Sequence, residues 1–326
     1  MKVIDIYRQA KGPVFSLEVS PPLNGASLDP VFATVKALLK YQPAYVSVTC
    51  SALGSARGGT VPIAGRLKGE LGVETVVHFT CVNKSRQDIE NLLMDVKYEG
   101  LQNILALRGD PPKGEKEFRP HPHGHRYASE FVRQISLVSR GKYLTGREGE
   151  YREGEPADFC IGVAGYPEGH PECPDPVKDL EHLKIKVESG AHYVITQLFF
   201  RPEYFFDFVE RARRAGITVP IIPGVMPIES FDQLRFILSQ PIGVKVPEPY
   251  VERFRRYKRD GDYLSARDYG VEYTVSMIES LLGYGVAGVH LYTMNTPERA
   301  GRVLERLRAR ASLDAHATRV APAEDE

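Results

Sequence analysis

Apolar, β-branched runs alternate along the chain with stretches whose apolar residues recur every three or four positions. The runs occupy residues 14–20, 45–50, 75–81, 103–110, 159–167, 193–200, 219–227 and 288–293. They are nearly continuous rather than alternating, which is typical of parallel strands that are covered on both faces. The pattern therefore predicts eight strands, each followed by a helix.

Two of the intervening helices carry clear boundary signals. Ser85 is a candidate N-cap for one of them, and Gly100 follows its last apolar position as a C-terminal glycine. In the other helix, Asp175 can cap the amino end, Pro176 suits the first helical position, and Gly190 ends the helix. Both signals support the strand–helix repeat.

Eight strand–helix units in one chain predict a (β/α)8 TIM barrel, here a single domain over residues 1–312. A doubly wound open sheet is the main alternative, and counting strands does not exclude it. No G-x-G-x-x-G or G-x-x-x-x-G-K-[ST] motif follows any strand, so a bound dinucleotide would not use a Rossmann fingerprint. The rhythm breaks at two insertions, a polar one at 140–158 and a helical one at 240–283, and residues 313–326 are expected to be a disordered tail.

Charge and cysteine content narrow the classes of function. The chain has 42 Lys and Arg against 42 Asp and Glu, which argues against nucleic acid or a membrane surface as partner. No apolar stretch is long enough to span a membrane, and the start lacks the apolar core of a signal peptide. The four cysteines form no CxxC pair and no zinc spacing, so no metal is expected. We expect a cytoplasmic protein and, from the usual preference for symmetric assemblies, a homo-oligomer.

Polar side chains stand near the carboxyl end of almost every predicted strand. They are Glu18, Thr49, His78, Asp110, Tyr166, Gln197, Tyr292 and Thr293, with Asn295 just beyond. Each one alone is compatible with an ordinary loop or core position. Together they fit a barrel, because barrels place their chemistry at the carboxyl ends of the strands.

Glu18 is the sharpest candidate, since it lies inside an apolar strand. Burial disfavours the ionised carboxylate, and a carboxyl group kept protonated near neutral pH is suited to general acid catalysis. The alternative is a salt bridge to Arg or Lys from a neighbouring strand. For His78 the sequence alone favours a satisfied core histidine, and His121, His123 and His125 are interpreted as a solvated loop.

A polar stripe follows the fifth strand. The segment 166–172 contains a tyrosine, a histidine and two carboxylates between prolines, and the next helix places Asp179, His182 and Lys186 at i, i+3 and i+7. A solvated helix face has the same pattern. A lysine at the mouth of a pocket would also meet a phosphate.

These segments, taken in order, resemble one family. FSLEVSPP, YVSVTC, HFTC, ALRGDPP, GYPEGHPE, ITQLFF, IIPGVMP and LYTMN resemble the FAD-dependent 5,10-methylenetetrahydrofolate reductases of methionine biosynthesis, over about residues 13–300. The resemblance implies bound FAD, NADH or NADPH as co-substrate, and a ping-pong reaction. In that reaction the reduced nicotinamide leaves before 5,10-methylenetetrahydrofolate binds and is reduced to 5-methyltetrahydrofolate.

The resemblance also implies roles for single residues. Glu18 matches the acid that protonates the folate, Asp110 the carboxylate near flavin and pterin, and Gln197 the glutamine that contacts folate and nicotinamide. Positions matching FAD contacts are Thr49, His78, Arg108, Gly109, Asp110, Tyr127, Ala128, Tyr166, His170, Asp179, His182 and Lys186. Folate-binding positions are Glu18, Asp110, Gln197, Tyr292 and Arg299, the last as a substitute for an arginine that some relatives carry where this chain has Thr296.

Departures and alternatives remain at this point. Residues 51–59 lack the acidic and basic pair expected before Thr60, which bears on the nicotinamide side, and the choice of NADH or NADPH stays open. The chain lacks the long regulatory domain of eukaryotic relatives, so control by S-adenosylmethionine is not expected. A barrel lyase using Glu18 and a lysine, and a non-catalytic flavin- or folate-binding barrel, are the alternative functions.

Overall fold

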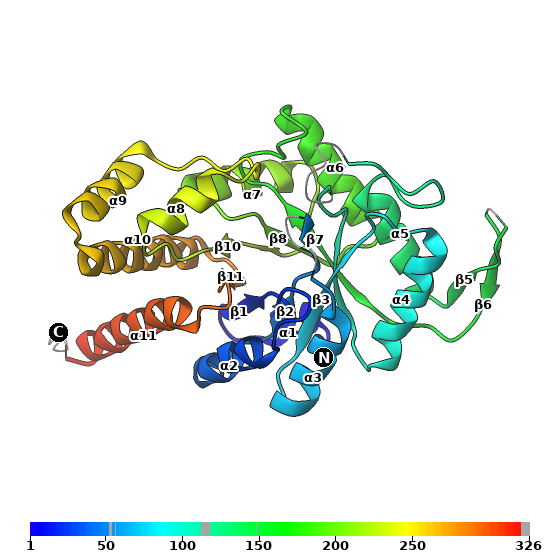
Figure 1. Ribbon diagram of the computed structural model, residues 1–326, viewed down its shortest axis with the longest axis horizontal. Helices are drawn as coiled ribbons and strands as arrows, with labels where there is room; N and C mark the ends of the chain where they lie inside the picture. The colour runs from blue at the N-terminus through cyan, green and yellow to red at the C-terminus, as the bar shows by residue number, and fades with distance from the viewer. Residues whose placement is uncertain (52–53, 56, 112–117, 148, 321–326) are drawn as a thin grey trace, which may run out of the picture.

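Parallel strands form the centre of the protein, in a computed structural model that describes residues 1–320 except 52–53, 56, 112–117 and 148. Within these residues the main sheet has nine strands in the order β10-β11-β1-β2-β3-β4-β7-β8-β9, flanked by helices (Figure 1). The strands are β1 Val14–Val19, β2 Val46–Val48, β3 Thr75–Thr80, β4 Asn103–Leu107, β7 Cys160–Gly165, β8 Tyr193–Thr196, β9 Ile221–Ile222, β10 Gly224–Val225 and β11 Gly288–Tyr292. The predicted (β/α)8 barrel is confirmed, and the open doubly wound sheet is excluded.

The barrel closes through a strand that is divided by a proline. β9 pairs with β8, while β10 pairs with β11, and Pro223 lies between the two halves. Proline has no N–H to give to a ladder, but its carbonyl oxygen accepts a hydrogen bond of 2.9 Å from the His290 N–H. The predicted run 219–227 is therefore one barrel strand in two short pieces.

Helices follow the strands around the barrel. They are α2 Asp29–Leu38 with the 3-10 turn η1 Leu39–Tyr41, α3 Thr60–Leu71, α4 Arg86–Tyr98, α5 Ala128–Ser139, α6 Pro176–Glu188, α7 Pro202–Arg214, α8 Phe231–Leu238 and α11 Pro297–Val320. The predicted caps are confirmed: Ser85 forms a capping box with Asp88, and the Asp175 carboxylate accepts from the first backbone N–H groups of α6.

The two insertions fold differently. Residues 240–283 form α9 Glu248–Asp260 and α10 Tyr263–Tyr284, in agreement with their helical pattern. The polar insertion 140–158, for which no strands were predicted, contains the antiparallel hairpin β5 Lys142–Leu144 and β6 Tyr151–Glu153. The hairpin projects from the barrel (Figure 1), so most of its side chains face solvent and give no apolar period in the sequence. Its strands are held by pairing of Tyr143 with Arg152, whose guanidinium lies 4.9 Å from the centre of the tyrosine ring.

Two further segments depart from the expectations. α11 continues to Val320, into the region expected to be a disordered tail, because no proline or glycine interrupts its last turns; residues 321–326 lie outside the described part. A short helix that the pattern did not reveal, α1 Val3–Gln9, buries Val3, Ile4 and Tyr7 against the amino end of the barrel. No helix in the described residues is both long and apolar enough to cross a membrane.

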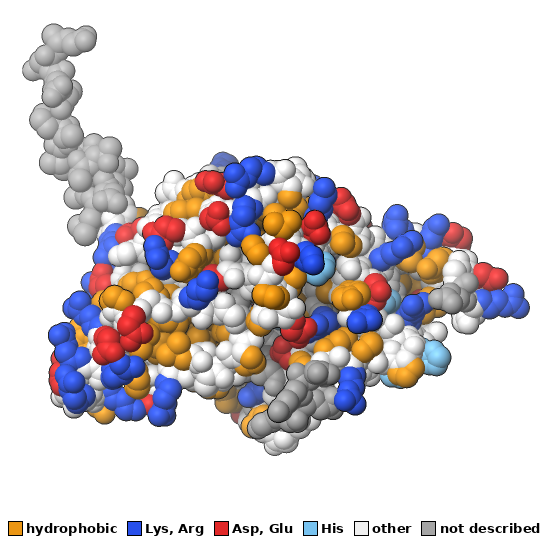
Figure 2. All heavy atoms as spheres, turned by 90° about the horizontal axis from the view of Figure 1, so that it is seen from above, with side chains coloured by type: hydrophobic (Ala, Val, Ile, Leu, Met, Phe, Trp, Pro, Cys, Tyr) orange, Lys and Arg blue, Asp and Glu red, His pale blue; other side chains and the backbone are white. Residues whose placement is uncertain are grey.

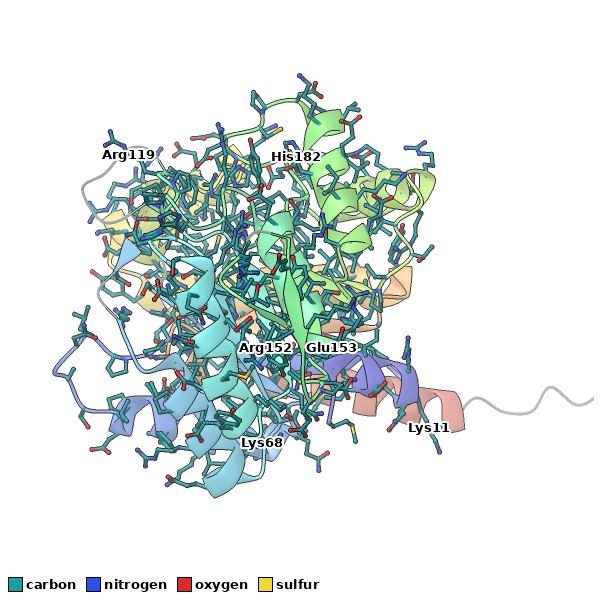
Figure 3. The ribbon with its side chains drawn as sticks, turned by 90° about the vertical axis from the view of Figure 1, so that its right-hand side faces the viewer. Lys11, Lys68, Arg119, Arg152, Glu153 and His182 are labelled. Carbon is teal, nitrogen blue, oxygen red and sulfur yellow. The ribbon has the colours of Figure 1, made fainter. Side chains whose placement is uncertain are left out.

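The two ends of the barrel are easily located in Figure 3. Arg119 and His182, which follow β4 and β7, lie toward the top, and Lys11 and Lys68, which precede β1 and β3, lie toward the bottom. Figure 2 looks down from above, and there the exposed Lys and Arg side chains of α9 gather at the left end, away from the barrel centre.

Candidate active site

Glu18 lies at the carboxyl end of β1, where its side chain is 18% exposed. Ladder pairing places it beside Ser47 of β2 and Tyr292 of β11. Its Oε2 atom faces two histidines, His78 Nε2 at 3.5 Å and His290 Nε2 at 3.7 Å. No Arg or Lys in the described residues pairs with it, so the salt bridge offered as the alternative explanation is absent there.

His78, from β3, is a neutral histidine at physiological pH. Burial lowers its pKa to about 4, the nearby Glu18 carboxylate opposes that shift, and His290 adds to it. Its Nε2 atom has no hydrogen-bond partner among the described residues. The satisfied core histidine considered from the sequence is therefore not what the structure shows, because one ring nitrogen is directed at Glu18 without a bond.

His290 is a site residue that the sequence pattern did not single out. It is fully buried in β11, with Nδ1 at 2.8 Å from Ser16 Oγ and Nε2 at 3.3 Å from Ser47 Oγ. The signal was present, since His290 interrupts an apolar run as Glu18 does. His290 is in the middle of β11, however, whereas the polar residues expected in a barrel site stand at the ends of strands.

The loop after β4 requires glycine at position 109. Gly109 has φ +91°, and a Cβ there would lie 2.7 Å from Val82 Cγ1. Arg108 beside it makes a bidentate ion pair with Glu172, with both N–O distances 2.6 Å, and this pairing raises the pKa of Arg108. Asp110 is exposed, and its charge is among the influences, after burial itself, that raise the pKa of Tyr166.

A half-buried lysine lies below the loop that follows β7. Lys186 Nζ donates a hydrogen bond of 2.6 Å to the Ala164 carbonyl oxygen, and burial lowers its pKa to about 8 against the opposing charge of Asp179. The Tyr166 ring lies 6.0 Å from the ammonium and packs edge-on against His170, with 4.6 Å between ring centres. The structure brings these predicted residues together at one place.

The polar stripe on α6 is only partly buried. Asp179 and Lys186 are half-buried on the barrel side, and burial raises the pKa of Asp179. His182 is exposed near the top of Figure 3. The stripe thus has an inner pair and an outer histidine, and it is not a uniformly solvated face.

The next strands carry Gln197 and Tyr292. Gln197 follows β8, where its Oε1 accepts from the Leu198 N–H at 2.9 Å. The Tyr292 hydroxyl donates to the Thr196 carbonyl oxygen at 2.6 Å. Burial, followed by the charge of Glu18, raises the pKa of Tyr292, which places its ring in the Glu18 neighbourhood.

The remaining predicted residues lie on the rim. Thr49 donates to Ser20 Oγ at 3.0 Å, and Thr60 donates to the Thr49 carbonyl oxygen at 2.9 Å. Tyr127 and Ala128 form the amino end of α5, where the Tyr127 N–H donates to the Glu130 carboxylate at 3.2 Å. Arg299 lies in the first turn of α11, half-buried.

Two acid–base groups outside the predicted set also emerge. Burial raises the pKa of Glu168 to about 7; its Oε2 accepts from the Lys245 N–H at 3.0 Å, while Oε1 has no partner among the described residues.

His125 is buried and bonded to Gln134 at 2.6 Å, so the expectation of a solvated loop is wrong for it. Its ring lies beside Phe131, with 6.3 Å between ring centres. Nowhere in the described chain do three or more His, Cys, Asp or Glu form a group able to hold a metal ion.

The fold and these side chains define a class: a (β/α)8 barrel with its polar and ionisable residues gathered at the carboxyl end of the strands, the arrangement of barrel enzymes. A family model described as methylenetetrahydrofolate reductase matches residues 3–308. The chain therefore belongs to the methylenetetrahydrofolate reductase family.

Curated relatives agree with this assignment. The chain is 34% identical over 295 residues to methylenetetrahydrofolate reductase 1 of Schizosaccharomyces pombe, covering 90% of this chain and 45% of the relative. It is 33% identical over 319 residues to methylenetetrahydrofolate reductase (NADH) 1 of Arabidopsis thaliana, covering 94% and 51%. A probable methylenetetrahydrofolate reductase (NADPH) of Caenorhabditis elegans is 35% identical over 304 residues, covering 90% and 42%. The chain spans about half the length of the curated relatives it matches.

A solved structure shares the fold. It is an uncharacterised protein from Clostridium thermocellum that binds two copies of 5-methyl-5,6,7,8-tetrahydrofolic acid. The TM-score is 0.59 with 11% sequence identity, covering 95% of this chain and 99% of that one. At this identity the likeness supports the barrel fold alone.

Proposed function

We propose that this chain reduces 5,10-methylenetetrahydrofolate to 5-methyltetrahydrofolate with NADH or NADPH, using bound FAD. The family match over residues 3–308 supports the reaction. The observation that carries the proposal is the Glu18 carboxyl group, which lies partly buried at the carboxyl end of β1 beside two imidazoles. A product of this kind would supply methyl groups for methionine synthesis.

The residues present suit FAD. Lys186 holds a buried ammonium with a pKa of about 8 and one backbone acceptor, so an anionic group beside it would restore its full charge. At the amino end of α5, Tyr127 and Ala128 would meet a phosphate after the Glu130 carboxylate releases the Tyr127 N–H. Arg108 would serve the same ligand after releasing or sharing Glu172. Hydride transfer, from NADH or NADPH and onward to the folate, is the chemistry that bound FAD supplies.

The other FAD contacts follow from the positions of their side chains. Tyr166 and His170 offer a packed aromatic edge next to Lys186, and Asp179 opposes it on α6. Gly109 allows the backbone to pass close to the end of β3. His78 and Thr49 line the neighbouring strand ends, and His182 lies outermost.

Around the folate, each residue has a separate task. Glu18 protonates the folate, which opens the methylene bridge to a reactive iminium. Asp110 stabilises the positive charge that develops on the pterin. Gln197 orients folate and nicotinamide, which bind in turn, while Tyr292 and Arg299 hold the rest of the folate. No nucleic acid, membrane or metal enters this scheme; we also propose a cytoplasmic homo-oligomer.

The test is a pair of half-reactions followed separately on protein reconstituted with FAD. Glu18→Gln is expected to leave flavin reduction by NADH or NADPH within about twofold of wild type. It should slow reoxidation by 5,10-methylenetetrahydrofolate by about 100-fold or more, the usual contribution of a general acid. Glu90→Gln, at a buried carboxylate on α4 that accepts from the Leu144 N–H at 2.8 Å, is the matched control and should leave both rates unchanged.

The alternatives give different outcomes. Failure to take up flavin would favour a barrel lyase and overturn the proposal. Bound flavin without turnover by either nicotinamide would indicate a non-catalytic flavin- or folate-binding barrel. Equal loss of both half-reactions in Glu18→Gln would remove the acid role from Glu18.

A further inference from the structure

Beneath Glu18, the interior of the barrel contains a second polar layer. Ser16 lies two residues earlier on β1, and His290 pairs with it across the ladder from β11. Ser47 of β2, which pairs with Glu18 in the ladder, reaches His290 from the level above. All three side chains are fully buried, so each must find its hydrogen-bond partners inside the barrel.

His290 has a hydroxyl group at each ring nitrogen. Ser16 Oγ is 2.8 Å from Nδ1, and Ser47 Oγ is 3.3 Å from Nε2. The ring stacks on Tyr45 with 6.1 Å between centres, and it meets Tyr292 edge-on at 5.4 Å. These contacts fix the plane of the imidazole.

The fixed plane directs His290 Nε2 toward Glu18. Nε2 lies 3.7 Å from Glu18 Oε2, and His78 Nε2 lies 3.5 Å from the same oxygen. Both separations exceed a hydrogen bond, so in the resting protein the contact is electrostatic. Contacts of this kind shorten when a substrate is bound. In both pairs Oε2 is the nearer of the two carboxylate oxygens.

We propose that His290 is the positioning residue of Glu18: its Nε2–H, shared between Ser47 Oγ at 3.3 Å and Glu18 Oε2 at 3.7 Å, favours the acidic proton on Oε1, the oxygen left for the folate. The Ser16 hydroxyl group donates a hydrogen bond to Nδ1 and thereby fixes the tautomer with the proton on Nε2. The inference deepens the proposed function and rests on it, because it assigns the source of the Glu18 orientation rather than a new reaction.

The proton balance is simple in this arrangement. Before transfer, Oε1 carries the proton and Oε2 is a carbonyl oxygen facing the Nε2–H. After transfer, the folate has gained one proton, Glu18 is a carboxylate, and Oε2 faces the same Nε2–H with a larger negative charge. His290 neither gains nor loses a proton. Because its N–H stabilises the carboxylate more than the acid, the contact favours proton release in the transition state.

Two amide variants of His290 distinguish the positioning of Glu18 from a purely structural role of the ring. In His290→Gln, the amide N–H extends to about the position of Nε2, whereas in His290→Asn it ends near Nδ1 and does not reach Glu18. We expect His290→Asn to slow reoxidation by 5,10-methylenetetrahydrofolate by about 100-fold, the cost of a misplaced reacting group. His290→Gln should recover most of that loss. Flavin reduction by NADH or NADPH should stay within about twofold of wild type in both variants.

Ser16→Ala provides a milder version, since it leaves the imidazole in place and removes the donor to Nδ1. We expect its folate half-reaction to fall between those of His290→Gln and His290→Asn. Equal rates in Gln and Asn, parallel loss of both half-reactions, or wild-type rates in all three variants would overturn the inference.

A readout without flavin or substrate decides the tautomer directly. In ¹⁵N-histidine-labelled protein, long-range ¹H–¹⁵N spectra distinguish Nε2–H from Nδ1–H, and the His290 signals are those lost in His290→Gln. The Nε2–H form is expected; an Nδ1–H form or a doubly protonated ring would refute the proposal. If wild-type protein reduces no folate, or Glu18→Gln stays active, the proposed function fails, and this spectrum still decides the state of His290.

Discussion

At the amino end of the barrel, α1 brings Tyr7 against Tyr45 and Tyr193, with a hydrogen bond of 2.8 Å between the first two hydroxyl groups. At the carboxyl end, Lys186 and Glu168 are also partly removed from water, but each is a group that can carry charge. Both ends bury polar atoms. The two ends differ in whether burial moves the pKa values of these groups toward neutral pH or away from it.

Burial raises the pKa of Tyr45 to about 12, and it moves those of Tyr7 and Tyr193 even further from neutrality. These phenols stay neutral at any physiological pH. All three contribute buried surface, and Tyr7 and Tyr45 share a hydrogen bond. At the other end, burial brings Lys186 to about 8 and Glu168 to about 7, close to neutral pH. Groups that titrate near neutrality are typical of functional sites. The amino end should therefore govern stability, and the carboxyl end should govern binding.

The largest effect is expected from Tyr193→Ala at the amino end. Tyr193 is fully buried and lies over Gly162, where a Cβ would come within 2.4 Å of its ring. Truncation leaves a large cavity and should lower the free energy of unfolding by about 3–5 kcal/mol, measured by urea denaturation. FAD affinity of the folded fraction should not change.

Tyr193→Phe is the matched control. The Tyr193 hydroxyl has no hydrogen-bond partner among the described residues, so its removal should leave stability equal or slightly higher. A large loss of FAD affinity in either variant would contradict the division between the two ends.

Gly109→Ala should give the next largest effect, at the carboxyl end. The positive φ of 91° is strained for alanine, and the new Cβ would press on Val82. Together these should cost about 1–3 kcal/mol of unfolding free energy and weaken FAD binding. Gly146→Ala, in the hairpin turn, shares the positive φ but has no atom within 4 Å of the new Cβ. If both variants lose the same stability, contact with Val82 contributes nothing.

The comparison between the ends also explains what the sequence could reveal. Strands covered on both faces give continuous apolar runs, so the barrel was predictable, and Glu18 was conspicuous because a carboxylate interrupts such a run. α1 has only seven residues, which is too short for a clear helical period of apolar positions. The sequence therefore did not reveal that this helix covers the amino end of the barrel. The division at Pro223 of the strand predicted over 219–227 could have been anticipated. Proline has no N–H to donate to a neighbouring strand, so it interrupts the ladder of a central strand.

Pairings between distant segments were not readable. Arg108 and Glu172 are 64 positions apart, and nothing in either segment specifies the partner. His290 and Ser16 are 274 apart, yet their alternation with Tyr292 and Glu18 would have placed all four inside the barrel once the strand register was known. The sequence thus identifies residue types at the strand ends, while the contacts that set their protonation come from the folded barrel.

Lys186→Met tests binding at the carboxyl end without a large change in stability. Losing the buried ammonium should weaken FAD binding by about tenfold, or about 1.4 kcal/mol, in a fluorescence titration at pH 7. In wild type the affinity should fall as the pH rises above about 8, because the free lysine loses its proton there and an anionic ligand prefers the protonated form. The variant should lack this dependence. Lys184→Met, at an exposed lysine on the same helix, should behave as wild type; equal losses in the two variants would exclude a specific role for Lys186.

The smallest effect concerns Glu168, on the loop after β7. Because its folded-state pKa of about 7 lies above the ordinary glutamate value of 4.5, the stability that it contributes is complete below pH 4.5 and is lost as the pH rises to about 7. Glu168→Gln should therefore raise the Tm at pH 8 by about 1–3 °C and leave it unchanged at pH 4.

Glu172, on the same loop, provides the control of opposite sign. Its ion pair with Arg108 lowers its pKa, so its contribution to stability is present at pH 8 and is lost on acidification. Glu172→Gln should lower the Tm at pH 8. Calorimetric scans of both variants at the two pH values decide the matter: if the two substitutions shift the Tm at pH 8 in the same direction, burial does not control the proton of Glu168, and the contrast between the barrel ends loses one of its two titrating groups.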